Sequence, residues 1–254
     1  MNKSVVAAQL YTVRDFTKTE VDIRKTFERV RKIGYKAVQI SALGKIEPSD
    51  LRKIADKNEL QIIASHISYD LITTDVGKVI EDHNLLGCRH VAIGGLPTEF
   101  RNQDGFYRFA VEASEAVKPI IDAGLTFSYH NHSFELEKFG QRTGLDILVE
   151  ESDPDYFSFE IDTYWIQHGG ANPVSFLKRL KDRMYIVHLK DMSMEGSKQL
   201  FAEVGEGNLE WDPILSACRN ANVEWYIVEQ DVCSGDPFDS LEISLKNLNR
   251  MGLV

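Results

Sequence analysis

Phe159-Glu160-Ile161-Asp162 reads as a buried strand that ends in a carboxylate, the side chain of Asp162. Two later stretches repeat this arrangement, Ile186-Val187-His188 and Ile227-Val228-Glu229. A charged side chain at the end of a buried strand destabilises a fold by several kcal/mol unless it is paired or binds a metal. Three such strands in one chain indicate a single polar cluster at one end of a sheet or barrel, and we interpret that cluster as a divalent metal site.

Around these stretches, strand and helix patterns alternate along the chain. The predicted strands cover residues 5–9, 37–40, 61–65, 90–93, 125–129, 157–161, 185–189 and 225–228. The predicted helices cover residues 20–33, 48–58, 75–86, 103–123, 144–151, 173–182, 211–221 and 238–251. Apolar periodicity, together with proline at helix starts and glycine at helix ends, supports these assignments. Pro119 lies inside the 103–123 segment and is expected to kink or shorten that helix.

Eight strands strictly alternating with eight helices over about 250 residues predict an α/β fold, a single (β/α)8 TIM barrel. A doubly wound open sheet is the rival, but that fold usually carries a glycine-rich turn after its first strand. Here the first strand leads into Leu10-Tyr11-Thr12-Val13-Arg14-Asp15, which has no glycine. We find no linker or low-complexity tract, so we predict one domain over residues 1–254.

The composition excludes several kinds of partner. With 43% hydrophobic and 27% charged residues, the 254-residue chain can bury a full core. Its net charge of -10 argues against a nucleic-acid groove and gives no attraction to anionic membranes. Three cysteines without a CxxC pair favour a reducing compartment. The start, Met1-Asn2-Lys3-Ser4, leads into an apolar stretch too short for a signal peptide, and no apolar run approaches the ~18 residues of a membrane helix, so we expect a cytoplasmic protein.

Polar side chains gather where the predicted strands end, and in such barrels the active site lies at the carboxyl ends of the strands. These residues are Gln9, Tyr11, Arg14, Gln39, His66, Tyr129, His130, Asn131, His132, Glu135, Glu160, Asp162, His188, Lys190, Glu229 and Asp231.

Asp162, His188 and Glu229 are ligand types for Zn, Mn, Co, Mg or Fe, and a mixed oxygen and nitrogen set does not choose among these metals. Each residue alone is more often part of a buried hydrogen-bond network, but three at neighbouring strand ends favour a metal. Alternation along the strand points His130 and His132 to the same side, so that one can bind metal and the other substrate.

Other candidates stay open between a functional and a structural role. Glu135 is a fourth ligand, an acid/base group or an acid at a helix start. His66 contacts substrate or is a satisfied core histidine. Lys190 contacts substrate or forms a salt bridge to Glu160 or Asp162. Arg14 suits a phosphate or carboxylate, while Trp165 offers an aromatic face on which sugars pack. Gln9 belongs with these candidate substrate-binding residues, and His168 is expected in a loop.

Six segments carry a family resemblance. They are QLYTVRD (9–15), YHNHSFEL (129–136), FEIDTYW (159–165), VHLKD (187–191), VGEGNLEW (204–211) and VEQD (228–231). Together they resemble the sugar phosphate isomerase/epimerase family with the xylose isomerase-like TIM barrel. That family includes inosose isomerases and dehydratases, ketose 3-epimerases and hydroxypyruvate isomerases. The resemblance extends over essentially the whole chain.

The resemblance implies one divalent metal ion held by Glu, Asp, His and Glu. Asp162, His188 and Glu229 match the last three positions, whereas His130 stands where relatives often have the first Glu. His132 matches a histidine that contacts substrate, and Glu135 is the alternative source of the missing carboxylate.

The chemistry implied by the resemblance is proton abstraction α to a carbonyl of a sugar or keto-sugar, through a metal-stabilised enediolate. Glu229 serves as one base, and the other is His130, His132 or Glu135. If Lys190 contacts substrate, it stabilises an enediolate oxygen or binds a hydroxyl. Isomerisation, epimerisation, dehydration and cleavage all begin with this step. Because basic residues do not cluster at the strand ends, an unphosphorylated sugar or keto-glycoside is at least as good a candidate as a sugar phosphate.

We therefore expect a sugar (phosphate) isomerase or epimerase that acts on a small carbohydrate. A lyase, dehydratase or hydratase on a keto-sugar is the first alternative, and a non-catalytic carbohydrate-binding or accessory subunit is the second. The same barrel also carries a DNA-repair endonuclease with three zinc ions. That enzyme needs several more His and Asp/Glu ligands and a basic groove, whereas this chain has only His168 and His188 after the histidines of the fifth predicted strand and a net charge of -10. Barrels of this kind are often dimers or tetramers, so a homo-oligomer fits as well.

Overall fold

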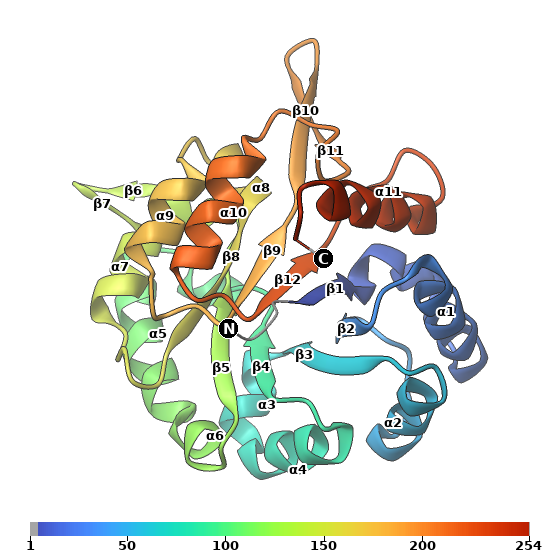
Figure 1. Cartoon of the computed structure of the whole chain (residues 1–254). Coiled ribbons are helices and arrows are strands. Elements are labelled where there is room, and N and C mark those ends of the chain that lie inside the picture. The colour runs from blue at the N-terminus through green and yellow to red at the C-terminus, as the bar shows by residue number, and fades with distance from the viewer. Residues whose placement is uncertain (1–4, 254) are drawn as a thin grey trace.

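The structure is a computed structural model that describes residues 5–253, and the predicted lead-in over residues 1–4 lies outside them (Figure 1). Eight parallel strands close into a barrel in the order β1-β12-β9-β8-β5-β4-β3-β2, so each strand lies beside its predecessor and the last closes onto the first. Figure 1 shows the helices arranged around the strands. The (β/α)8 barrel predicted from the alternating pattern is confirmed.

The barrel strands are β1 (Val5–Gln9), β2 (Ala37–Ile40), β3 (Gln61–Ile67), β4 (His90–Ile93), β5 (Thr126–His130), β8 (Ser158–Asp162), β9 (Ile186–Leu189) and β12 (Trp225–Val228). Two hairpins lie outside the barrel sheet, β6 (Lys138–Phe139) with β7 (Arg142–Thr143), and β10 (Asp191–Glu195) with β11 (Lys198–Ala202).

The α-helices are α1 (Glu20–Ile33), α2 (Pro48–Lys57), α3 (Tyr69–Thr74), α4 (Val76–Leu86), α5 (Gln103–Ala116), α6 (Lys118–Asp122), α7 (Gly144–Glu151), α8 (Thr163–His168), α9 (Pro173–Arg179), α10 (Trp211–Asn220) and α11 (Pro237–Arg250). Three 3-10 helices complete the set, η1 (Leu10–Phe16), η2 (Thr98–Phe100) and η3 (Phe134–Leu136). None of the helices within residues 5–253 combines the length and apolar character needed to cross a membrane.

The predicted helix over 103–123 is two helices, with the break at Val117 between α5 and α6. Pro119 lies in the first turn of α6, where its missing N–H leaves no helical hydrogen bond unmade. The predicted helix over 75–86 begins one residue later, because the Asp75 side chain accepts a hydrogen bond from Lys78 N and caps α4. Proline therefore accounts for the first boundary, and side-chain capping sets the second.

Two elements beside the site were missed. His168 does not lie in a loop as predicted, since it is the last residue of α8. Helix α8 starts directly after β8 because the Asp162 carboxylate accepts a hydrogen bond from Trp165 N at 2.9 Å. The β10–β11 hairpin also had no counterpart in the predicted pattern, and it projects away from the barrel (Figure 1).

The core has two parts. A large apolar cluster lies between the strands and the surrounding helices, and a small one of buried alanine and isoleucine residues fills the barrel interior. Interior residues Ala37, Ala7 and Ile227 lie level with one another on adjoining strands. Because side chains alternate, the residues two positions further along face the same interior, and they are Gln39, Gln9 and Glu229. The barrel interior thus changes from apolar to polar towards the carboxyl ends of its strands.

Candidate metal centre

Four buried side chains converge at the carboxyl ends of strands β5, β8, β9 and β12. His130, Asp162, His188 and Glu229 each place one donor atom within 4.8 Å of the others. Asp162 lies level with His188 on the neighbouring strand, so parallel pairing places these two side by side. These four residues are the ones that the sequence nominated as metal ligands.

The contacts within this cluster are close. His188 Nδ1 lies 2.9 Å from Glu229 Oε2 and 3.9 Å from Asp162 Oδ2. His130 Nε2 lies 3.3 Å from the same Asp162 oxygen, and His130 Nδ1 is buried without a hydrogen-bond partner among the described residues. Two carboxylates and two imidazoles are a donor set that divalent Mn, Fe, Co and Zn accept. The convergence and the chemistry of these side chains fit a divalent ion.

A second network behind the cluster holds His188 in place. His188 Nε2 lies 2.7 Å from Gln39 Oε1 and 3.0 Å from Glu160 Oε1. Gln39 Nε2 donates to Glu160 Oε1 at 2.9 Å, and His66 Nε2 lies 2.6 Å from Glu160 Oε2. Because the Nε2 side of the ring faces only acceptors, it carries a proton, and Nδ1 is directed at Glu229 and Asp162. This arrangement fixes which nitrogen faces the candidate metal.

The charge balance around His188 follows from these contacts. Burial alone would lower the pKa of His188, but the carboxylates of Glu160 and Glu229 outweigh burial and raise it to about 10. Burial would also raise the pKa of Glu160, yet His188 and His66 hold it well below its usual range. Without a metal, His188 is therefore an imidazolium at neutral pH, and a metal ion must displace its Nδ1 proton to bind there.

Lys190 supplies a permanent positive charge beside the cluster. Its ammonium group is fully buried and lies 3.0 Å from Asp162 Oδ2, 2.8 Å from Glu229 Oε2 and 2.6 Å from Asp231 Oδ2. Burial alone would lower the pKa of Lys190, but Asp162, Glu229 and Asp231 raise it well above its usual range. Of the two ion pairs considered from the sequence, the one with Asp162 forms, while Glu160 pairs with histidines instead.

A cavity of about 310 Å³, which we call the central cavity, lies at this end of the barrel. Its lining contains four residues nominated from the sequence as ligands, bases or substrate contacts, His66, His130, His132 and Glu229. Two other lining residues, Tyr11 and Asp231, were among the polar strand-end residues but had no assigned role, and sequence reasoning had not nominated Ser41, Ile67 and Gly94.

The pair Gly94-Gly95 was the available signal for part of this lining. A Cβ atom on Gly94 would lie 3.0 Å from His66 Nδ1, and one on Gly95 would lie 3.3 Å from His132 Cε1. Gly95 also has a φ of 157°, a conformation that residues with side chains rarely adopt. Two glycines directly after a barrel strand therefore let two histidines approach the cavity from either side of the β4–η2 loop.

His132 lines the central cavity, whereas Glu135 does not. Glu135 is fully buried and accepts hydrogen bonds from Tyr129 OH at 2.6 Å and His132 N at 2.9 Å. Burial raises the pKa of Glu135 to about 7. For His132, burial together with repulsion from His130 and Lys190 lowers the pKa to about 3, so its imidazole is neutral at pH 7.

Gln9, Arg14 and Trp165 lie near the site but are not among the residues that line the central cavity. Gln9 Oε1 accepts a hydrogen bond from Tyr11 N at 3.1 Å. Arg14 donates to Tyr11 O at 3.0 Å, and its guanidinium lies 4.3 Å from the centre of the Tyr11 ring. The ring of Trp165 lies 5.2 Å from that of His132. In this structure the first two residues hold Tyr11, which lines the cavity, and Trp165 packs against His132.

Comparisons with known proteins agree with this architecture. The profile of the family described as xylose isomerase-like TIM barrel matches residues 27–250. An inosose dehydratase of Lacticaseibacillus casei is 22% identical over an alignment that covers 87% of this chain and 86% of that protein.

Solved structures are similar over nearly the full chain. A sugar phosphate isomerase/epimerase from Parabacteroides distasonis ATCC 8503 superposes with a TM-score of 0.83 at 21% identity, covering 99% of both chains. An L-ribulose 3-epimerase gives a TM-score of 0.73 at 14% identity, covering 98% of this chain and 94% of that one. At these identities the likeness shows the fold, and the activity has to be argued from the site.

Proposed function

The chain belongs to the xylose isomerase-like TIM barrel family, and on that basis we propose that it is a metal-dependent enzyme that abstracts a proton α to a carbonyl of a sugar or keto-sugar. One observation carries this proposal. The buried donors of His130, Asp162, His188 and Glu229 converge at the carboxyl end of the barrel, where His130 and Glu229 also line the central cavity. That is where barrel enzymes place their chemistry.

A divalent ion held by these four side chains would act as a Lewis acid on substrate oxygens. The surrounding residues bind and orient the sugar. Tyr11, Ser41 and His66 line the central cavity and offer hydrogen-bonding groups to hydroxyls. Lys190 keeps Asp162 and Glu229 ionised by lying within 3.0 Å of both.

Two groups suit proton transfer in the central cavity. Glu229 lines the cavity, and although burial would raise its pKa, Lys190 and His188 hold that pKa well below its usual range, so the carboxylate is available as a base. His132 lines the same cavity as a neutral imidazole and can give or receive a proton there once substrate is bound. Glu135 acts through His132, since it accepts the His132 backbone N–H and does not line the cavity.

Proton abstraction followed by return of a proton gives an isomerase or epimerase. Dehydration of a keto-sugar is the second candidate, and two observations favour it. Relatives that cover most of the chain are named inosose dehydratases. In addition, Glu229 and His132 line the same cavity, so a carboxylate base is paired with an imidazole that can exchange a proton with a leaving hydroxyl.

The test of the proposal has two steps. Elemental analysis of protein purified without chelator is expected to give about one Mn, Fe, Co or Zn per chain, with the metal lost in His188→Ala and kept in the control variant His168→Ala, because His168 lies outside the cluster. Incubation of the metal-loaded enzyme with keto-sugars in D2O is then expected to exchange a carbon-bound proton. A product that is an isomer or epimer of the sugar and carries carbon-bound deuterium indicates isomerisation or epimerisation. A product that has lost one water molecule indicates dehydration.

Wild-type protein that takes up no metal even after soaking would refute the metal centre and leave a carbohydrate-binding or accessory role. The small carbohydrate partner, the homo-oligomer, the cytoplasmic location and the lack of nucleic-acid binding stay predictions.

A further inference from the structure

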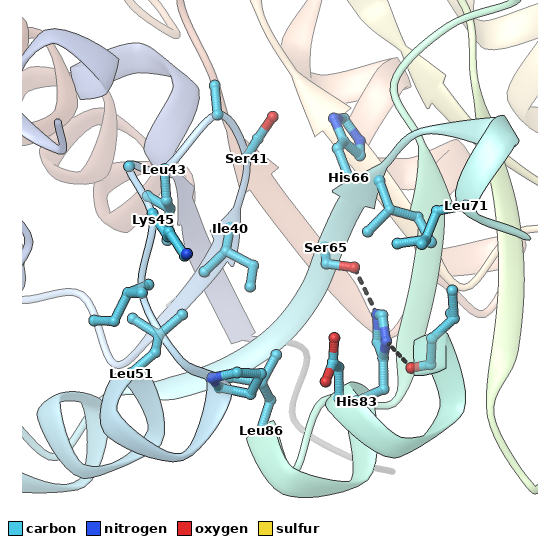
Figure 2. Close-up of a pocket in the computed structure, with 17 residues that line it drawn as sticks. Ile40, Ser41, Leu43, Lys45, Leu51, Ser65, His66, Leu71, His83 and Leu86 are labelled. Atoms are coloured by element: carbon cyan, nitrogen blue, oxygen red, sulfur yellow. Dashed lines mark hydrogen bonds between the residues drawn. The ribbon is translucent and has the colours of Figure 1, made fainter. Parts of the chain in front are cut away.

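A second cavity adjoins the central one. It has a volume of about 360 Å³ and lies between the β2–α2 loop and helices α3 and α4 (Figure 2). Its walls carry mostly aliphatic side chains, including those of Ile40, Leu43, Leu51, Leu71, Val79 and Leu86. We call it the apolar pocket.

The apolar pocket and the central cavity share part of their lining. Ser41, His66 and Ile67 line both of them. Figure 2 shows Ser41 and His66 at the upper end of the apolar pocket, with Leu51 and Leu86 at its base. A ligand whose reacting carbon lies in the central cavity can therefore extend past Ser41 and His66 into the apolar pocket.

Three of the polar side chains that line the apolar pocket, Ser65, Asp82 and His83, already have partners. His83 Nε2 lies 2.6 Å from Ser65 Oγ, and His83 Nδ1 lies 2.7 Å from Val79 O, as the dashed lines in Figure 2 mark. Asp82 is bound by Lys78 at 3.0 Å. With these groups satisfied, the pocket offers a hydroxylated ring few hydrogen bonds and suits an apolar group.

The two linings also offer an anionic substituent few cations. Among their described residues the exposed Lys45 is the one lysine or arginine, whereas Glu229, Asp231 and Asp82 contribute carboxylates. The nearby ammonium of Lys190 already contacts three carboxylates. A phosphate group would normally be held by arginine or lysine donors, so these cavities are poorly suited to a sugar phosphate.

From these observations we propose that the apolar pocket binds an apolar substituent of the sugar. The substrate class is then a keto-glycoside, a glycoside whose sugar ring carries a ketone, with an aromatic or aliphatic group as the substituent, and it is neither a free sugar nor a sugar phosphate. Apolar cavities of about 150 Å³ in other proteins accept benzene, so the volume here suffices for a ring with substituents. This inference rests on the proposed function, because it takes the sugar to lie in the central cavity.

The experiment measures binding to the metal-loaded full chain by isothermal titration calorimetry. The probes are methyl and phenyl pairs of α- and β-D-glucopyranoside, galactopyranoside and mannopyranoside, with glucose 6-phosphate beside them. For at least one pair, the phenyl glycoside is expected to bind at least about tenfold more tightly than the methyl glycoside, because burying the ring removes apolar surface from water.

The variants Leu43→Asp and Leu71→Asp each place a charge in the apolar pocket, at partly buried positions on different segments. Both are expected to abolish the preference for phenyl over methyl. Leu85→Asp is the control, since Leu85 lies on α4 but is 49% exposed and does not line the pocket. Circular dichroism melting checks that each variant is folded.

The outcomes separate the two proposals. Equal binding of phenyl and methyl glycosides, tighter binding of glucose 6-phosphate, or a phenyl preference that survives in both folded pocket variants overturns the apolar subsite and leaves the proposed function standing. If no glycoside binds and no keto-sugar exchanges a proton in D2O, the proposed function fails and the subsite fails with it.

Discussion

Replacing Lys190 with methionine tests the electrostatic argument at the centre of the site. Methionine keeps much of the side-chain volume but removes the ammonium group, which lies within 3.0 Å of Asp162, Glu229 and Asp231. Lys190, Asp162 and Glu229 are almost completely buried, so water cannot replace the lost charge. The variant therefore leaves buried carboxylates without their main counter-charge.

Breaking a buried ion pair by removing one partner costs about 3–5 kcal/mol. For a chain of this size, each kcal/mol lowers the melting temperature by about 2–4 °C, so metal-free Lys190→Met is expected to melt about 6–20 °C below the wild type. A divalent ion bound at the same carboxylates restores positive charge, so the deficit should narrow when Mn²⁺ is added.

Differential scanning calorimetry with chelator and with Mn²⁺ measures both effects. Lys178→Met is the matched control, because Lys178 is exposed on α9, and it should melt within about 2 °C of the wild type. Metal-free Lys190→Met that melts as high as this control would refute the reasoning, since the carboxylates would then not depend on Lys190.

Three further predictions concern the metal centre. Asp162→Asn is expected to stay folded and to lose bound metal and turnover, and full metal content by elemental analysis would contradict the assignment. His188 holds its proton with a pKa of about 10, and a metal ion that binds His188 must displace that proton. The apparent Kd for Mn²⁺ should therefore fall about tenfold for each pH unit between about pH 6 and about pH 8. A Kd that does not change with pH, measured by calorimetry, argues against His188 as a ligand. Glu160→Gln should weaken metal binding by about 10–100-fold, since Glu160 orients His188, and an unchanged Kd would show that Glu160 does not position the ligand.

The carboxyl-end cluster could be predicted because it depends on local pattern. Residues at the ends of parallel strands meet at one end of a barrel, so Asp162, His188 and Glu229 could be grouped from their positions after apolar stretches. The same logic placed His130 and His132 on one side of their strand. The alternation of side chains along one strand and the succession of strands along the chain are visible directly in the residue types.

The partners of several side chains could not be predicted in the same way. Gln39 on β2 contacts Glu160 on β8 and His188 on β9, which lie across the barrel from it. Glu135 was left open between ligand, base and helix-start acid, and its hydrogen bonds to Tyr129 and His132 direct it away from the central cavity. These contacts join residues whose distance depends on closure and rotamer choice rather than on spacing in the chain.

The sequence by itself determined the barrel and the set of polar residues at its carboxyl end, because strand and helix periodicity and the parallel strand order suffice for both. Only the tertiary structure decided that the Lys190 ammonium contacts three carboxylates, that Glu160 fixes the orientation of His188, and that an apolar pocket adjoins the central cavity. The physical reason is that charge pairing and cavity shape depend on atoms brought within a few ångströms by closure of the barrel, and no periodicity along the chain encodes those distances.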